Sequence, residues 1–147
     1  MSDLLNLPDE NSYRFIALLN KKIPTGILMN ALGHMTAGLA GGYDKSKEMC
    51  FLQYKDKDTG VHPNISHFPF IVLAADNSEQ IRKVRMEAIT QHVIYTDFTN
   101  TMTIGTSQQQ INATIITPEV ELEYYGICLF GKTEILRPFT KKFSLFK

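Results

Sequence analysis

The chain has 147 residues, with 15 Lys plus Arg, 15 Asp plus Glu and 44% hydrophobic residues. A chain of this length forms one domain and buries about 68–70% of the surface that its unfolded form exposes, so it needs no disulfide or metal to hold a core. The composition excludes disordered, collagen-like and mucin-like proteins. Basic and acidic side chains also balance within each half of the chain, which argues against an extended nucleic-acid-binding surface.

Residues 1–11 are polar and are expected to form a tail before a single domain over residues 12–147. Because this tail has neither a basic start nor an apolar centre, we expect no signal peptide and a cytoplasmic location. No apolar run is long enough for a membrane span. Cys50 and Cys128 lie far apart in apolar runs, which predicts two reduced core thiols and no zinc site.

The first elements alternate between strand and helix. The apolar run 13–19 predicts a central strand, and a helix is expected over residues 26–40 with Thr25 as its cap and Gly41-Gly42 as its stop. The next segments are expected to be a strand at 49–54, a charged turn at 55–60, an irregular proline-containing loop at 61–68 and a strand at 70–74. A second helix at 79–90, capped by Asn77 or Ser78, follows.

The second half continues the alternation. A strand at 92–98 runs into the hydroxyl-rich segment 99–106, and periodicity leaves 108–116 open between helix and strand. Beyond it we expect a helical first turn at Pro118, a strand at 125–130 and a basic, aromatic carboxyl-terminal segment at 132–147 with a short helical turn. Together these elements predict an α/β fold, a three-layer sandwich with a mixed sheet flanked by helices.

Asn30, His34 and Gly38 share one face of the first helix because they are four residues apart. A second stripe is nearly free of bulky side chains and consists of Gly26, Asn30, Gly33, Ala37 and Ala40. One interpretation is close packing, with His34 a hydrogen-bonded core residue. The other is the floor of a pocket, at a helix whose amino-terminal end attracts anions.

Asp97 ends a strand in which alternation places Val93, Tyr95 and Asp97 on one face and Ile94, Thr96 and Phe98 on the other. Asp97 either caps a turn or serves as a site carboxylate beside the Thr101 or Thr106 hydroxyl and the Gly105 backbone, because α/β folds bind ligands beyond the carboxyl ends of strands.

His62 and His67 have no evident third ligand nearby, so no metal site is expected there. The basic residues at the carboxyl terminus are interleaved with Phe139, Phe143 and Phe146. This segment is expected to be a solvated edge whose aromatic rings tuck under the domain, and the alternative is a surface for a phosphate-bearing partner.

Residues 25–34 (TGILMNALGH) and 97–106 (DFTNTMTIGT) resemble the two motif regions of type II peptidyl-tRNA hydrolases. Over nearly the whole chain, the sequence is more similar to a bacterial and fungal domain family of unknown function that resembles those hydrolases in fold. Segments 123–126 (EYYG) and 140–145 (TKKFSL) also carry this similarity.

The resemblance implies a peptidyl-tRNA hydrolase type II-like fold, a homodimer and no cofactor. It implies catalytic roles for the residues matching the hydrolase motifs, Asp97, Thr101 and His34, and ligand-binding roles for Gly26, Asn30, Gly105 and Thr106. Ile27 stands where the hydrolases carry a lysine important for activity, and Ala31 stands where they carry a glutamine.

Two functions are therefore expected. The favoured one is a binding module that holds a small polar ligand or a partner's terminus between the first helix and the Asp97 segment. The alternative is a hydrolase acting on peptidyl-tRNA or a related ester or amide, in which Asp97 and Thr101 orient a water and His34 is the acid or base. Since Ile27 removes the cation that would stabilise an oxyanion, tRNA is the less favoured partner.

Overall fold

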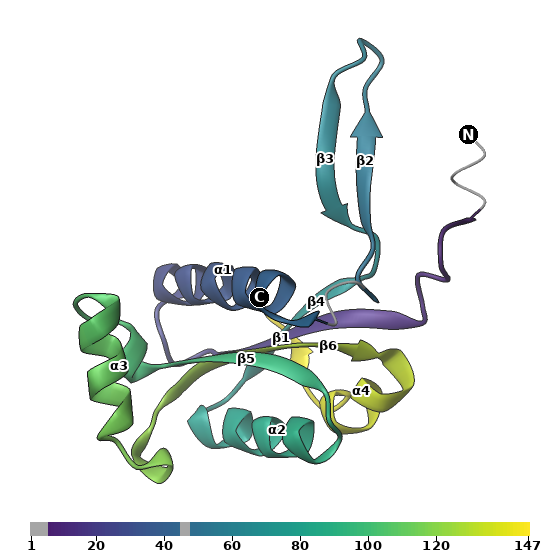
Figure 1. Ribbon diagram of the computed structural model, residues 1–147. Helices are drawn as coiled ribbons and strands as arrows, with labels where there is room; N and C mark the ends of the chain where they lie inside the picture. Colours follow the sequence, from purple (N-terminus) through teal and green to yellow (C-terminus); the bar gives the residue numbers. More distant parts are fainter. Residues whose placement is uncertain (1–5, 45–47) are drawn as a thin grey trace.

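The computed structural model describes residues 6–44 and 48–147. Its strands and helices follow in chain order (Figure 1): β1 Tyr13–Asn20, α1 Thr25–Gly42, β2 Phe51–Lys55, β3 Val61–Ser66, β4 Phe70–Ala75, α2 Ser78–Thr90, β5 Ile94–Thr99, α3 Ser107–Ile115, β6 Tyr124–Lys132, α4 Thr133–Thr140 and β7 Ser144–Leu145. Two short 3-10 helices, η3 Asn100–Met102 and η4 Glu119–Glu121, flank α3. Residues 1–5 of the expected amino-terminal tail lie outside the described residues.

The main sheet has five strands in the order β5-β6-β1-β4-β7. β1 runs parallel to β4 and antiparallel to β6, while β5 pairs antiparallel with β6 and β7 with β4. The sheet is therefore mixed, as expected, and β1 lies at its centre. Helix α1 and the β2–β3 hairpin together connect the parallel strands β1 and β4.

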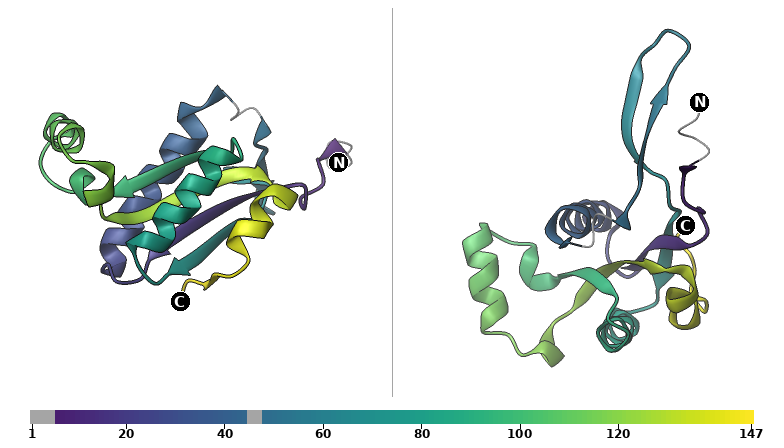
Figure 2. Two further views of the ribbon diagram at one scale, coloured as in Figure 1. Left: turned by 90° about the horizontal axis from the view of Figure 1, so that it is seen from below. Right: turned by 45° about the vertical axis from the view of Figure 1, so that its right-hand side comes forward.

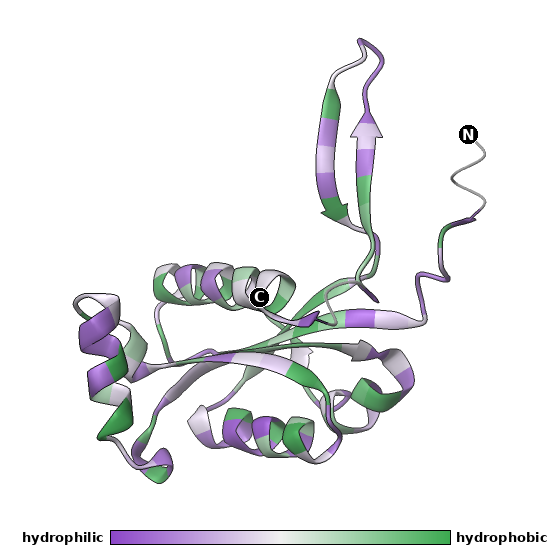
Figure 3. Cartoon of the chain, in the orientation of Figure 1, coloured by the Kyte–Doolittle hydropathy of each residue, from purple (hydrophilic) through white to green (hydrophobic). Residues whose placement is uncertain are grey.

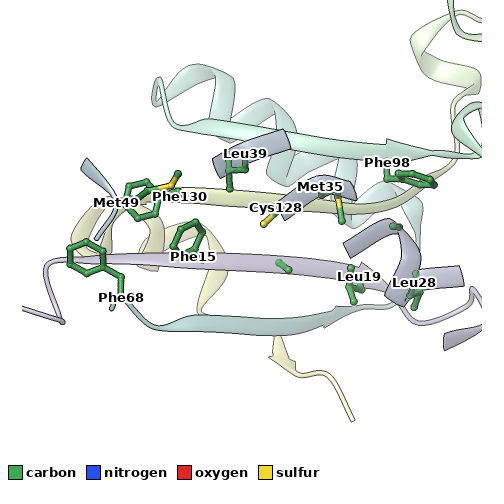
Figure 4. Packing of buried hydrophobic residues seen from close by; sticks show 12 residues of the cluster. Phe15, Leu19, Leu28, Met35, Leu39, Met49, Phe68, Phe98, Cys128 and Phe130 are labelled. Atoms are coloured by element: carbon green, nitrogen blue, oxygen red, sulfur yellow. The ribbon is translucent and has the colours of Figure 1, made fainter. Parts of the chain in front are cut away.

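Helices cover both faces of this sheet and make three layers (Figure 2). On one face, α1 buries Leu28, Ala31, Met35 and Leu39 in a cluster with β1 and β6 residues (Figure 4). On the other, α2 and α4 pack Ile81, Val84, Ala88 and Leu136 against the second set of sheet residues. β1 contributes to both cores because its residues alternate between them, which explains why its sequence is apolar at nearly every position.

Strands β2 and β3 form a separate two-stranded hairpin that projects from the body (Figures 1 and 2). The prediction of an irregular loop over 61–68 was wrong, because Val61–Ser66 is β3 and pairs antiparallel with β2. Pro63 is tolerated because a two-stranded ribbon leaves an outer edge on each strand that needs no ladder donor. The charged turn is confirmed: the Asp56 carboxylate accepts the backbone N–H groups of Asp58 and Gly60.

The helix boundaries differ from prediction at α1. Pro24, and not Thr25, occupies the cap position, and no side chain caps the helix. Gly41 and Gly42 belong to the last turn of α1, and Tyr43 ends the helix in an extended conformation. The cap of α2 is confirmed at Asn77, whose side chain accepts the Gln80 N–H at 3.0 Å.

The undecided segment 108–116 is helical and belongs to α3. Thr106 and Gln109 form a reciprocal capping box there, in which each side chain binds the other's backbone N–H. The helical turn predicted after Pro118 is the 3-10 helix η4, and the helical turn predicted near the carboxyl terminus is α4.

Candidate functional site

A cleft of about 890 Å³ opens between the amino-terminal half of α1, strand β5 and the η3–α3 segment. This volume lies within the range of small-molecule sites. The lining of the cleft combines apolar side chains with polar residues, among them the acidic residue Asp97. Its lining residues are Gly26, Ile27, Asn30, His34, Met35, Thr96, Asp97, Phe98, Met102, Thr103, Gly105, Thr106, Ser107 and Gln110.

Helix α1 presents Asn30 and His34 to the cleft. Both residues are exposed, because the opposite face of the helix buries Leu28, Ala31 and Met35. Neither side chain forms a hydrogen bond to another residue in the described parts of the chain, and the His34 ring lies 6.0 Å from the Phe98 ring, centroid to centroid. The interpretation of His34 as a buried, hydrogen-bonded core residue is therefore wrong. Both side chains remain available to a ligand.

The mouth of the cleft beside the α1 amino terminus is apolar. Ile27, which occupies the place of the hydrolase lysine, lines the cleft and is 44% exposed. Among the described residues that line the cleft, none is Lys, Arg or Glu. The cleft thus offers hydrogen-bonding groups without a formal positive charge.

Gly105 and Thr106 line the opposite wall, where α3 begins. Gly105 has a positive φ of 69°, and a Cβ at this position would overlap the Gln109 side chain. Gln109 must occupy that space because its amide oxygen accepts the Thr106 N–H at 2.7 Å. Glycine therefore lets the chain turn sharply into α3 and sets the position of this wall.

Thr101 does not line the cleft and is almost completely buried. Its hydroxyl lies 2.8 Å from the Thr99 hydroxyl and 2.8 Å from the Thr114 hydroxyl. The Thr114 hydroxyl also lies within hydrogen-bonding distance of the Gln110 carbonyl. The structure thus uses Thr101 to tie η3 to α3, and does not bring its hydroxyl to the ligand space where the sequence analysis placed it.

The Asp97 carboxylate also lies apart from His34. It accepts a hydrogen bond from Arg85 Nε of α2 at 3.1 Å, on the sheet face that α2 covers. The neighbouring Thr96 hydroxyl points the other way and donates to the Met35 carbonyl of α1 at 2.8 Å. The alternation predicted for this strand is confirmed, but it places the carboxylate across the sheet from the α1 side chains. Asp97 nevertheless remains one of the residues that line the cleft.

Burial raises the pKa of Asp97, and the charge of Arg85 partly opposes this shift. Next to this pair, Arg82 binds the Glu119 carboxylate and donates to the Leu122 carbonyl at 2.8 Å, while the Tyr124 hydroxyl donates to Glu119 at 2.7 Å. These contacts fix η4, and with it the far end of α3, against the body. The role of Arg82, Glu119 and Tyr124 is therefore structural.

The lining residues that were not predicted as site residues are Ile27, Met35, Thr96, Phe98, Met102, Thr103, Ser107 and Gln110. A signal for Ser107 and Gln110 was present, since Thr106 followed three residues later by Gln109 is a capping-box pattern that starts a helix. That pattern predicts α3, and with it Ser107 and Gln110 on its first turns. Met102 and Thr103 line the cleft because of the η3 turn, which no local sequence pattern predicts.

No three His, Cys, Asp or Glu side chains converge as a metal site within residues 6–44 and 48–147. His62 contacts the Asp56 carboxylate at 2.9 Å, and His67 contacts the Pro8 carbonyl at 2.7 Å. Both cysteines are free thiols, with Cys128 buried and Cys50 half-buried. Among the described helices, none combines the length and apolar character required to cross a bilayer.

The chain belongs to a family of proteins of unknown function, DUF2000, whose family model matches residues 13–147. No curated protein matches the sequence. A solved structure of a protein of unknown function from Agrobacterium tumefaciens has the same fold, with a TM-score of 0.78 and 16% sequence identity, over 92% of this chain and 98% of that one. The comparisons confirm the family and the α/β fold.

Proposed function

We propose that this protein is a binding module that holds a small, uncharged polar ligand in the cleft between α1, β5 and α3. The observation that carries the proposal is the pair Asn30 and His34, exposed in the cleft without described side-chain partners. Ligand sites place a few polar side chains in an otherwise apolar cleft to orient the ligand, so two polar side chains that line this cleft without protein partners favour recognition by hydrogen bonds.

The charge of the cleft supports an uncharged ligand. The Asp97 carboxylate is neutralised by Arg85 on the other sheet face, and the described lining includes no Lys or Arg that would attract a phosphate. The apolar lining residues Ile27, Phe98 and Met102 provide surface for a ligand's nonpolar part.

A screen of uncharged amides, sugars and nucleosides by ligand-observed NMR tests the proposal. We expect a hit whose affinity falls about tenfold in His34→Ala or Asn30→Ala, the cost of about one hydrogen bond at the upper end of its usual range. His62→Ala is the matched control, because His62 is an exposed histidine on the hairpin, outside the cleft. A hit that binds His34→Ala and Asn30→Ala as tightly as wild type contradicts the proposed site.

The second candidate is a hydrolase on a type II peptidyl-tRNA hydrolase-like fold. The position of His34 in the cleft favours it, because imidazole is an effective acid or base near neutral pH. The positions of the Asp97 carboxylate and the Thr101 hydroxyl favour the binding module instead. Release of peptide from peptidyl-tRNA, or turnover of acetyl-amino-acid esters, that is lost in His34→Ala would establish the hydrolase and overturn the binding module.

A further inference from the structure

Strand β5 is an edge strand of the main sheet. A hydrogen bond to the Tyr95 carbonyl shows which backbone groups of β5 point away from the sheet. The Tyr43 hydroxyl, just beyond α1, donates to the Tyr95 carbonyl at 2.5 Å. In an antiparallel strand, each residue directs its N–H and C=O to the same side, and successive residues alternate sides. The backbone N–H and C=O of Tyr95 therefore point to the free edge of the sheet, and so do those of Asp97, two residues further along the strand.

The other end of the sheet gives the same result independently. Thr133 N–H donates to the Ser12 carbonyl at 3.0 Å, just before the first pair of the β1–β6 ladder, Tyr13 and Lys132, so the backbone N–H of Thr133 points toward the β1 side of β6. Alternation from Thr133 directs the backbone of Ile127 toward β1 and that of Cys128 toward β5. Cys128 is opposite Thr96. Thr96 thus pairs with β6, and the Asp97 N–H and C=O point away from the sheet.

The cleft lies against this free edge at Asp97. At one end of this free edge, the Tyr95 carbonyl already accepts a hydrogen bond from the Tyr43 hydroxyl. On the other side the chain leaves the strand after Thr99 and turns into η3. Between these limits, Asp97 presents one backbone donor and one backbone acceptor, the two groups with which a residue of an extended chain forms a pair in a sheet.

We propose that the cleft binds an extended, uncharged peptide segment of about three residues, which adds to the edge of β5 through two backbone hydrogen bonds with Asp97. This inference rests on the proposed binding function and names the class of its ligand. The absence of charged side chains pointing into the described lining suits a peptide backbone, which is polar but uncharged. Asn30 and His34 line the same cleft and offer side-chain hydrogen-bonding groups to the remaining amides of the segment.

The pairing also determines which peptide side chains enter the cleft. Residues directly opposite each other in a sheet project their side chains to the same face. The central residue therefore projects toward the α2 face, where the Asp97 carboxylate meets Arg85. The two flanking residues project to the α1 face, toward Ile27 and Met102. The site is expected to favour a small central residue with apolar neighbours.

The test uses acetyl-Leu-Ala-Leu-methylamide as the probe, with the wild-type protein labelled with 15N. We expect binding to shift the Asp97 backbone amide resonance and to slow its hydrogen exchange. The matched control is a depsipeptide in which an ester oxygen replaces the N–H of the central residue, so that the Asp97 carbonyl loses its donor while the ligand keeps its shape. Its affinity is expected to be about tenfold lower.

Equal affinity of the two ligands, or binding without a shift at Asp97, overturns the inference. So does an Asp97 amide that is already protected from exchange in the free protein, because a second copy of the chain would then cover the edge. Failure of the peptide beside a non-peptide hit that depends on His34 and Asn30 refutes the peptide class and leaves the proposed function intact. A cleft in which neither kind of ligand binds refutes both.

Discussion

Arg85 of α2 and Asp97 of β5 form an ion pair across the sheet face opposite the cleft, with Nε donating to Oδ2 at 3.1 Å. The two side chains are 24% and 17% exposed, so each depends on the other for much of its polar environment. This pair separates the role of the Asp97 carboxylate in stability from the role in the cleft that we propose for the Asp97 backbone.

Arg85→Met is expected to lower the free energy of unfolding at pH 7 by about 2 kcal/mol, because it leaves a largely buried carboxylate unpaired. Without Arg85, the already raised pKa of Asp97 rises further. An acid whose folded-state pKa exceeds its unfolded value binds more protons when folded, so this loss shrinks as the pH falls toward the unfolded value near 4. Urea denaturation at pH 7 and pH 4.5 measures it, and the double variant Arg85→Met/Asp97→Asn should show little of this pH dependence. If Arg85→Met lowered the free energy of unfolding equally at both pH values, Asp97 would not be the group that Arg85 stabilises.

Thr101→Val should destabilise the protein by about 1–2 kcal/mol, because it removes the hydroxyl that joins Thr99 to Thr114 while preserving the shape of the side chain. Hydrogen exchange in α3 should rise as the link from η3 is lost. Thr90→Val is the matched control, because its hydroxyl binds the Met86 carbonyl in an exposed helix end. An equal loss of stability in Thr101→Val and Thr90→Val would contradict the view that the Thr101 hydroxyl links η3 to α3.

Gly105→Ala is expected to cost about 1–2 kcal/mol, since alanine is strained at positive φ and its Cβ would displace Gln109. Gly33→Ala provides the opposite control: it lies within α1, and a Cβ there meets no atom within 4 Å. Alanine at position 33 should stabilise the helix by up to about 1 kcal/mol. Thermal unfolding of the two variants distinguishes these effects by their sign.

Helix α3 carries the surface through which we predict that the protein forms a homodimer. None of its described residues is buried, and Ile115, Ile116 and Val120 are each about four-fifths exposed near its carboxyl end. Figure 3 shows that hydrophobic colour is concentrated in the lower half of α3. Residues 98–118 contain no charged side chain, which matches the depletion of charge at interface cores and suits a self-complementary, two-fold contact. We predict a dimer by light scattering that Ile115→Glu converts to a monomer, whereas Glu87→Lys on α2 does not. A monomeric wild type would refute this prediction.

The two thiols should react at different rates. Burial is the main cause that raises the pKa of Cys128 to about 12, and the side chain has no exposed surface. Ellman's reagent at pH 8 is therefore expected to label Cys50 first and to reach Cys128 only after denaturation. A Cys50→Ser variant that still reacts rapidly while folded would contradict this expectation.

Sequence patterns determined the elements that form from strong local preferences. Residues of β1, β4 and β6 are apolar nearly throughout, which predicts buried strands. The cap at Asn77 is predictable because an Asn side chain can accept a free backbone N–H in the first turn of a helix. The resemblance to a family of unknown function also identified the family correctly. Alternation in β5 correctly separated Asp97 from Thr96 and Phe98.

Only the tertiary structure decided which partners these faces meet. Alternation cannot show that α1 covers the Thr96 face and α2 the Asp97 face, because that choice depends on the path of connections around the sheet. The same limit explains β3, which exists through pairing with β2 despite Pro63. It also explains Thr101, whose hydroxyl is buried because α3 supplies Thr114. The sequence placed the site residues in two segments, and packing decided that the cleft receives the His34 side chain and the Asp97 backbone.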